Sequence, residues 1–277
     1  MKKIIITAIA IGTTTILGFS ANASATTFGS NITIYDQKSD GNTWHQDTEH
    51  NVPNGEDNEV EPGMLHGQQW DLEGFYLDGT KLTAVGGFDF INGAPNYAQY
   101  SSGDLFLDIN GDATFGTNAT DPSNILNGYD IVLDLDFSDM SNLNYDIIDL
   151  RSGTIGLLDV EGYNSPESSP WKYDSGGTFL DSGVIEYTST AAFDNSTLGL
   201  LGYNGNEDHN AFTVDIGFLV NLGLLSVGEE FTAHFTMGCG NDNLMGRGTA
   251  PVPEPATMLL FGTGLVGLAG AYRRKKK

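Results

Sequence analysis

Along the middle of the chain, short segments of alternating apolar and polar residues follow one another, and most of them end at Gly, Asn or Asp. The clearest segment is YDIVLDLDF at residues 129–137. Its odd-numbered positions from Ile131 to Phe137 are apolar, whereas the even-numbered positions from Asp130 to Asp136 are aspartates except for Val132. Side chains alternate between the two faces of a strand, so this pattern predicts an antiparallel strand with one buried face and an acidic outer face.

A hairpin is predicted in residues 75–90, FYLDGTKLTAVGGFDF, because two apolar runs flank Asp78-Gly79, a pair typical of a type I′ turn. Further strand candidates share a short apolar pattern: GDLFLDI (103–109), YDIIDL (145–150), GTIGLLDV (153–160), GVIEYTS (183–189), AFTVDIGFLV (211–220) and EEFTAHFTM (229–237). Only residues 215–225 have a helical pattern, and their Gly residues weaken it. We therefore predict an all-β body with a β-sandwich or jelly-roll-like fold.

Residues 1–25 have the pattern of a secretory signal peptide. Lys2 and Lys3 precede a largely apolar stretch, residues 4–19, and the small-residue segment ANASA follows it. The spacing of the small residues predicts cleavage after Ala23 or Ala25, so the mature chain begins at Ser24 or Thr26. The alternative is a retained membrane helix, which the short and Thr-interrupted apolar stretch disfavours.

The C-terminus carries three successive signals of a membrane-directed tail. Pro253, Glu254 and Pro255 come first, and the uncharged residues 256–272 follow. At the helical rise this run covers about 25 Å, near the lower limit for a bilayer core about 30 Å thick, so we predict a transmembrane helix. The basic terminus consists of Arg273, Arg274, Lys275, Lys276 and Lys277. Its charge predicts a cytoplasmic C-terminus and an exported body.

This order of a Pro-Glu-Pro motif, a short apolar segment and a basic terminus resembles the PEP-CTERM sorting signal. The resemblance implies that residues 251–277 are a sorting tail, recognised and removed by an exosortase, a membrane-embedded cysteine transpeptidase. Proteins with this signal are exported by Gram-negative bacteria that make extracellular polysaccharide. A simple C-terminal anchor is the alternative, which the Gly residues of the apolar run disfavour.

Several body segments also look like stretches of uncharacterised PEP-CTERM proteins: EDNEVEPG, WDLEGF, GGFDF, GDLFLDINGD and HFTMGCGNDNLMGRG. This second resemblance implies no activity.

Residues 26–250 are the predicted extracytoplasmic body, in which residues 26–62 are an acidic arm or loop region. Residues 26–253 contain five basic and 35 acidic residues, a formal charge of −30. Such a surface repels nucleic acid and attracts cations, so nucleic acid is excluded as a partner. Cys239 is the only cysteine, which excludes a disulfide within the chain.

One short segment, DLFLDINGDATFG at residues 104–116, is a candidate calcium site. Asp108, Asn110 and Asp112 stand at alternate positions, a spacing that lets a tight loop direct several oxygen atoms at one hard cation. The segment lacks the Gly and Glu positions of an EF-hand loop. The alternative is an ordinary turn at the end of a strand, since Asp, Asn and Gly are also the residues that turns prefer.

Motifs of hydrolytic enzymes are absent from the sequence. It contains neither HExxH nor GxSxG, and His45 and His50 are spaced too widely for one helical face. His66 is interpreted as a solvated loop histidine like these two. His234 and Cys239 are five residues apart, which puts them on opposite faces of a strand. We therefore predict no catalytic residue and no cofactor other than Ca²⁺.

Four aromatic residues, Trp44, Trp70, Trp171 and Tyr173, are candidates for stacking on sugars, with core packing as the alternative. Our leading hypothesis is a non-enzymatic exported protein. It is anchored transiently in the inner membrane, sorted by an exosortase, and then resides at the cell surface, on the outer membrane or outside the cell. Its expected partners are extracellular polysaccharide or other matrix proteins. A calcium-dependent carbohydrate-binding module is the second hypothesis, and a polysaccharide hydrolase is the third.

Overall fold

The computed structural model describes residues 28–34, 67–94, 96, 100–114, 126–158, 160, 168–189 and 209–251. The predicted signal peptide, most of the acidic arm and the sorting tail after Pro251 lie outside these residues.

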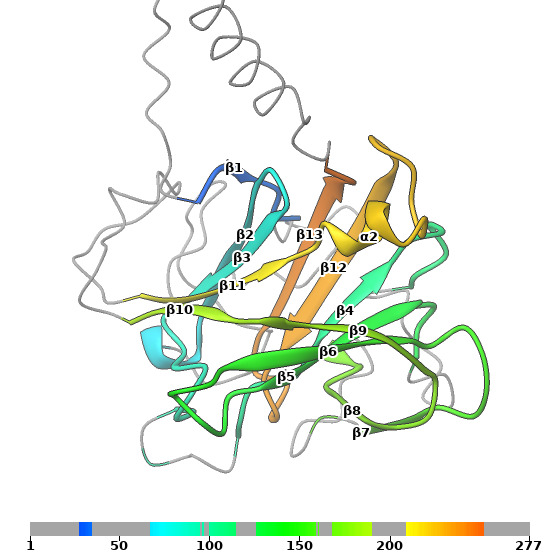
Figure 1. Cartoon of the computed structure of the whole chain (residues 1–277). Coiled ribbons are helices and arrows are strands. Elements are labelled where there is room, and N and C mark those ends of the chain that lie inside the picture. The colour runs from blue at the N-terminus through cyan, green and yellow to red at the C-terminus, as the bar shows by residue number, and fades with distance from the viewer. Residues whose placement is uncertain are drawn as a thin grey trace, which may run out of the picture.

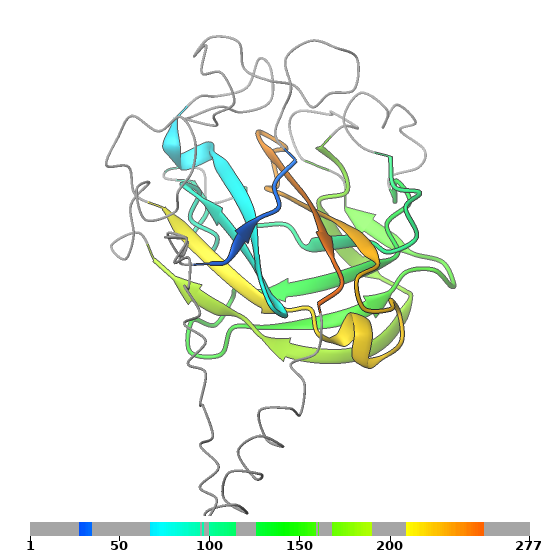
Figure 2. The same ribbon diagram turned by 90° about the horizontal axis from the view of Figure 1, so that it is seen from above.

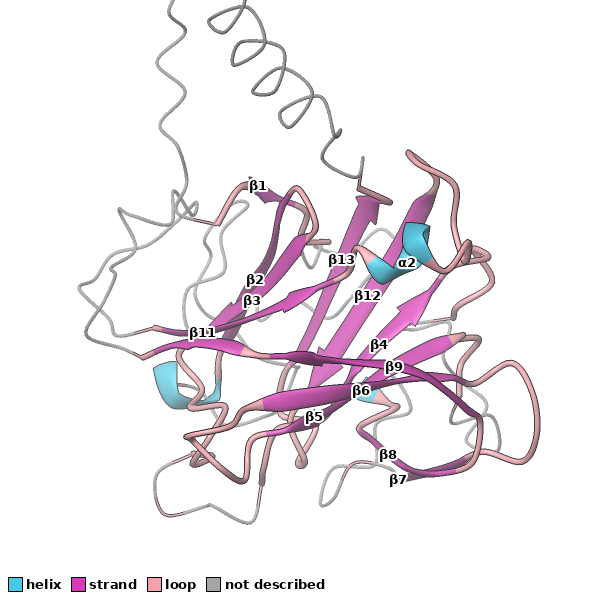
Figure 3. Ribbon diagram, in the orientation of Figure 1, coloured by secondary structure: helices cyan, strands magenta, loops and turns pink. Residues whose placement is uncertain are grey.

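The described residues form two antiparallel sheets packed face to face (Figures 1 and 3). In the first sheet the spatial order of the strands is β1 (Ser30–Asn31), β2 (Leu72–Asp78), β3 (Lys81–Gly86), β11 (Asn210–Asp215) and β10 (Glu186–Thr188). In the second sheet it is β13 (Asn243–Thr249), β12 (Glu230–Thr236), β4 (Leu105–Asp108), β5 (Ile131–Asp136), β6 (Asn144–Asp149) and β9 (Thr178–Val184). A small hairpin pairs β7 (Gly156–Leu158) with β8 (Lys172–Ser175). The predicted sandwich is confirmed.

The main core fills the space between the two sheets. At its centre the rings of Phe90, Phe212 and Phe235 meet in tilted and edge-to-face contacts, with centroids 4.9 to 5.5 Å apart. All three side chains are fully buried. Aromatic rings bury large apolar areas and prefer such offset geometries, so this cluster is a major source of the sandwich's stability.

Two segments pass from one sheet to the other along the sides of the sandwich. On one side, β1 pairs with β2, and Thr33 two residues later bridges Gly246 of β13. On the other side, β9 pairs with β6, and after Ile185 the chain continues as β10 on β11. A chain that changes sheets in this way joins the two layers through backbone hydrogen bonds as well as through the core.

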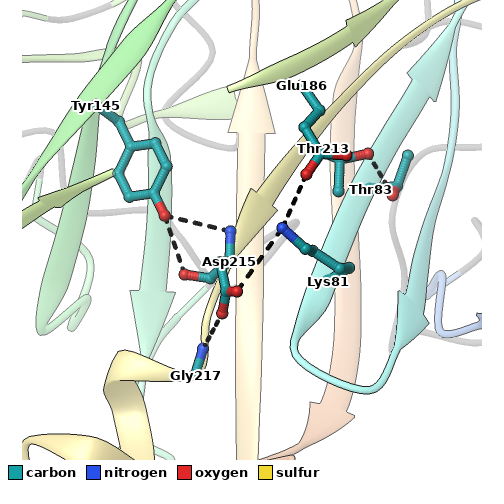
Figure 4. A network of polar contacts seen from close by, with 7 residues as sticks. All are labelled: Lys81, Thr83, Tyr145, Glu186, Thr213, Asp215 and Gly217. Carbon is teal, nitrogen blue, oxygen red and sulfur yellow. Dashed lines mark hydrogen bonds and ion pairs between the residues drawn. The ribbon is translucent and has the colours of Figure 1, made fainter. Parts of the chain in front are cut away.

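Side-chain contacts tie the two sheets together at the end of β11 (Figure 4). The Tyr145 hydroxyl on β6 donates to the carbonyl of Asp215 at 3.0 Å and accepts from its N–H at 3.2 Å. On the neighbouring strands, Lys81 Nζ lies 2.9 Å from Glu186 Oε1 and 3.7 Å from Asp215 Oδ2. The ion pairs are partly exposed and contribute little, whereas the buried tyrosine contributes a specific link between the layers.

The acidic outer face predicted for residues 129–137 is only partly correct. Ile131, Leu133 and Leu135 lie in the main core as expected, but Val132 on the other face is also fully buried. It belongs to a row of cross-strand neighbours on the outside of the second sheet: Met245, His234, Phe106, Val132, Ile148 and Phe179. Leu157 of β7 and Tyr173 of β8 pack against this row. The hairpin therefore forms a third layer, beyond which Asp136 is exposed.

Two local predictions also change. Asp78 pairs with Lys81, so the loop of the first hairpin is Gly79-Thr80, one residue later than predicted. Only Gly79 has a positive φ, 57°, whereas a type I′ turn needs one at both loop positions. In residues 215–225 only Phe218–Asn221 are helical, as α2. A separate 3-10 turn, η1, covers Gln68–Trp70.

Candidate functional site

The predicted calcium loop lies at the end of β4, where Asp108 organises a tight turn. Its Oδ1 accepts the N–H groups of Asn110 and Gly111 at 3.0 and 2.7 Å, and its Oδ2 accepts the N–H of Ala113 at 3.2 Å. Gly111 has a φ of 82°, which a glycine adopts without strain. Asp108 itself is buried. These bonds are the turn chemistry that was the alternative interpretation, although Oδ2, which accepts one N–H group, keeps a second lone pair.

A second buried carboxylate, which the sequence pattern did not single out, supports the same loop. Asp130 Oδ2 accepts the N–H of Ile109 at 2.9 Å, and Asp130 Oδ1 accepts from Asn110 Nδ2 at 3.1 Å. Burial raises the pKa of Asp130, and the nearby Asp108 and Asp112 add to this rise. Among the described residues no group of three Asp, Glu, His or Cys side chains is arranged to hold a metal ion. Calcium binding at Asp108, Asn110 and Asp112 stays a prediction.

A calcium titration with two variants separates a binding site from a turn. Asp112 is exposed, so Asp112→Ala removes a candidate ligand and keeps the turn bonds of Asp108. If calcium binds, millimolar Ca²⁺ raises the midpoint of thermal unfolding of the wild type more than NaCl of equal ionic strength, and Asp112→Ala reduces this shift. Asp108→Ala lowers stability by about 1–3 kcal/mol even without calcium, because three partly buried hydrogen bonds lose their acceptor. Equal shifts with Ca²⁺ and NaCl would leave the loop a turn.

The sorting tail begins directly after the last strand of the second sheet. After β13 ends at Thr249, Ala250 donates its N–H to the carbonyl of Glu229 at 2.6 Å and accepts the N–H of Gly228 at 3.0 Å. Pro251 is still buried. The Pro-Glu-Pro motif therefore starts three residues beyond Ala250, whose backbone the sandwich holds through two hydrogen bonds.

Two hollows flank Arg247 near this point. One, of about 420 Å³, is lined by Ser30, Leu77, Pro251 and neighbouring residues. The other, of about 240 Å³, reaches the Asp108 loop. Ser30 and Pro251 share the first hollow, so the first and the last parts of the described body lie at one end of the sandwich (Figures 1 and 2).

A buried polar cluster lies elsewhere, and sequence reasoning did not identify it. His209 Nε2 lies 2.8 Å from Glu73 Oε1, and both side chains are fully buried. Gln68 donates to the same Glu73 oxygen at 3.0 Å. Nearby, Asp242 accepts the N–H groups of Leu72 and Asn243, and burial of its carboxyl raises its pKa to about 7. The stretches WDLEGF and HFTMGCGNDNLMGRG thus come together here, which their separation in the sequence concealed.

His234 and Cys239 face different layers, but the strand that was predicted to separate them, β12, ends at Thr236, and Cys239 lies in the turn beyond it. His234 lies in the outer row, where its Nε2 is 2.9 Å from the carbonyl of Pro170, and burial lowers its pKa to about 4. Cys239 lies in the main core, and burial raises the pKa of its thiol to about 11. Thiolates are the reactive form, so this cysteine is a poor nucleophile.

The aromatic candidates for sugar stacking are largely internal. Trp70 and Trp171 are buried, and Tyr173 on β8 is partly buried against the outer row and donates its hydroxyl to the carbonyl of Gly176. Trp44 lies outside the described residues, as do His45, His50 and His66.

In the described part of the chain, no helix has the length and apolarity needed to cross a bilayer. A rigid sandwich followed immediately by a Pro-Glu-Pro tail defines an exported protein that is sorted through its C-terminus. The PEP-CTERM protein-sorting motif matches residues 251–275, so the chain carries this motif and is an exported, surface-sorted protein processed by an exosortase. Comparisons with the curated proteins and with the solved structures found no match.

Proposed function

We propose that the mature protein is a non-enzymatic component of the cell surface or extracellular matrix that associates with secreted polysaccharide through calcium held between carboxylates. The sorting motif supplies the route to the surface. The proposal concerns what the body does once it has arrived there.

The observation that carries the proposal is the charge of the exposed body. Among the described residues the basic side chains are Lys81, Lys172, Arg151 and Arg247, and two of these are already engaged. Lys81 contacts Glu186 and Asp215, and Arg151 makes a two-pronged contact with Asp149. The sequence therefore has too few basic side chains to neutralise most of the surface carboxylates. The remaining negative charge favours binding of divalent cations. Carboxylate oxygens are suitable ligands for Ca²⁺ and can share one ion with an acidic polymer.

The alternatives receive less support from the described residues. A carbohydrate-binding module needs exposed aromatic platforms, and Trp70 and Trp171 are buried. A hydrolase needs a carboxyl group with a raised pKa that meets substrate. Asp104 and Asp242, whose pKa values are raised to about 7, are bonded to backbone N–H groups.

The test is co-sedimentation of the mature protein with the acidic exopolysaccharide of the producing cells, with a neutral dextran as control. We expect binding in millimolar Ca²⁺, release by a chelator, and no change in the length of the polymer. Binding that survives the chelator and extends to dextran would favour the carbohydrate-binding module. Shortening of the polymer would favour the hydrolase.

A further inference from the structure

One loop at the tail end of the sandwich is uncharged and exposes two large apolar side chains. Residues 216–228 contain no Asp, Glu, Lys or Arg, although residues 26–253 carry a formal charge of −30. This segment contains α2 and the loop that leads into β12. Leu222 and Val227 in it are 46% and 48% exposed. Exposed apolar side chains gathered on one uncharged segment are typical of a surface that meets an apolar partner.

The loop is held rigidly beside the exit of the tail. Leu219 is fully buried, and its carbonyl accepts the N–H groups of Leu224 and Leu225 at 2.9 Å. At the other end of the loop, Gly228 donates to the carbonyl of Ala250 at 3.0 Å. Figures 1 and 2 show α2 next to the end of β13 in both views. The exposed Leu222 and Val227 therefore have a fixed position relative to the start of the sorting tail.

The length of the connecting chain restricts how far this end can lie from a membrane. Six residues separate Ala250 from Ala256, where the uncharged run begins. An extended chain of six residues spans at most about 20 Å. The polar layer between the hydrocarbon core and water is about 6–7 Å thick on each side of a bilayer. When residues 256–272 are inserted, Ala250 and the loop bonded to it are thus close to the lipid surface.

The other end of the chain adds to this restriction. Ser30 lies in the same hollow as Pro251, and the predicted signal peptide ends four or more residues before it. Before either cut, both membrane-directed segments would leave from one end of the body. We propose that residues 216–228 form a lipid-contact loop, in which Leu222 and Val227 enter the boundary between headgroups and acyl chains of the inner membrane while the tail spans it.

This contact rests on the membrane stage of the sorting route and is independent of the function proposed for the mature protein. Next to the loop in the sequence stand the carboxylates of Asp215 at its start and of Glu229 and Glu230 at its end, and Asp215 Oδ1 accepts the N–H of Gly217 at 2.8 Å. Glu229 Oε2 accepts the N–H of Ser226 at 2.7 Å and so caps the loop from the body side. Docking of the uncharged loop turns the same end of β13 toward the membrane.

Fluorescence quenching in proteoliposomes tests the contact. The full chain carries an environment-sensitive fluorophore on Ser226→Cys, an exposed position between the two apolar side chains, in vesicles of phosphatidylethanolamine and phosphatidylglycerol. The buried Cys239, whose thiol pKa is raised to about 11, reacts slowly at neutral pH. A second reporter, on Met140→Cys, lies in the turn between β5 and β6 and is 71% exposed there. Spin-labelled lipid with a shallow nitroxide should quench the label at residue 226 and leave the label at 140 unquenched.

Substitutions in the loop then test whether the quenching depends on the apolar side chains of the loop or only on the membrane-inserted tail. Leu222→Ser with Val227→Ser, in the Ser226→Cys background, should lower the ratio of docked to undocked label about tenfold, since two half-exposed apolar side chains are lost from the contact. Met140→Ser in the same background is the matched control and should change nothing. Circular dichroism of each variant confirms that the sandwich is intact.

Equal quenching at residues 226 and 140 would overturn the proposal. Quenching at residue 226 that appears only when exosortase is added would also overturn it, in favour of a protein contact. The co-sedimentation of the mature protein with polysaccharide should be unaffected by Leu222→Ser and Val227→Ser. If it fails with the wild type while the quenching result holds, only the proposed function is wrong.

Discussion

Replacing Pro253, Glu254 and Pro255 by alanine will stop release of the protein, so that the full-length precursor accumulates in the inner membrane. Proline cannot continue a helix and favours an extended residue before it, so the sequence predicts that the motif does not join a helix formed by the apolar run. The apolar run and the five basic residues are unchanged in this variant, so insertion and orientation should persist. Because the cut is lost, the effect on the amount of surface protein should be close to complete.

Fractionation of the cells, followed by mass spectrometry of each fraction, measures this outcome. The wild-type surface protein should yield no peptide from beyond Tyr272, and the variant should yield such peptides in the inner-membrane fraction only. Thr257→Ala, inside the apolar run, is the matched control and should be released normally. Recovery of RRKKK on wild-type surface protein would make the tail a permanent anchor.

The second large effect concerns Asp104, a fully buried aspartate immediately before β4. Its two oxygens accept the N–H groups of Leu135 and Tyr173 at 2.9 and 2.8 Å, which link β4 to β5 and to the outer hairpin. Burial raises the pKa of Asp104 from 3.8 to about 7, partly offset by Lys172. The folded protein therefore keeps a proton that the unfolded chain releases at a lower pH.

The sign of the pH dependence follows from this difference. The contribution of Asp104 to stability is fully present below about pH 4 and is lost as the pH rises to about 7. One such proton changes the free energy of unfolding by at most about 1.4 kcal/mol per pH unit. Asp242, with a pKa raised to about 7, acts in the same direction. His234 acts in the opposite direction, because its pKa is lowered from 6.5 to about 4 and its contribution is lost as the pH falls between these values.

Between about pH 5 and pH 7 the combined effect of the two aspartates is larger than the opposite effect of the one histidine. We therefore expect the free energy of unfolding of the wild type to fall as the pH rises over this range. Asp104→Asn should reduce the change of the free energy of unfolding with pH by up to the contribution of one proton, about 1.4 kcal/mol per pH unit. It should also lower stability at pH 5 by about 1–3 kcal/mol, because one backbone N–H then faces an amide NH₂. Urea unfolding at pH 5, 6, 7 and 8 measures both effects. Asp146→Asn on the exposed face of β6 changes the net charge equally and is the control. An unchanged slope in Asp104→Asn would show that this carboxyl does not titrate in the window.

Much of the fold could be predicted from local patterns. The alternation in residues 129–137 placed Ile131, Leu133 and Leu135 in the core correctly, because a strand with one buried face has a period of two. The same period could not show that Val132 is buried as well. Its burial depends on a hairpin, β7–β8, that folds over the outside of the sheet. Alternation shows which residues share a face of the strand. Whether another layer packs on that face depends on segments far away in the sequence.

The candidate sites likewise contain residues that the local sequence brings together and residues that only the fold brings together. Asp108, Asn110 and Asp112 are neighbours in the sequence, so their common turn was predictable, whereas Asp130 joins them only because β5 pairs with β4. Glu73 and His209 are separated by 136 positions and meet through the order of strands in the sheet. No local signal marks such a pair.

The sequence by itself determined the destination of the protein, because a sorting signal is read as a short linear segment and its motif, apolar run and basic residues are contiguous. It also determined the class of fold, since strand periodicity and turn residues are local properties. Only the tertiary structure decided that Ser30, residues 216–228 and Pro251 lie at one end of the sandwich. That arrangement depends on long-range strand pairing, and it is the one that brings an uncharged loop beside the tail.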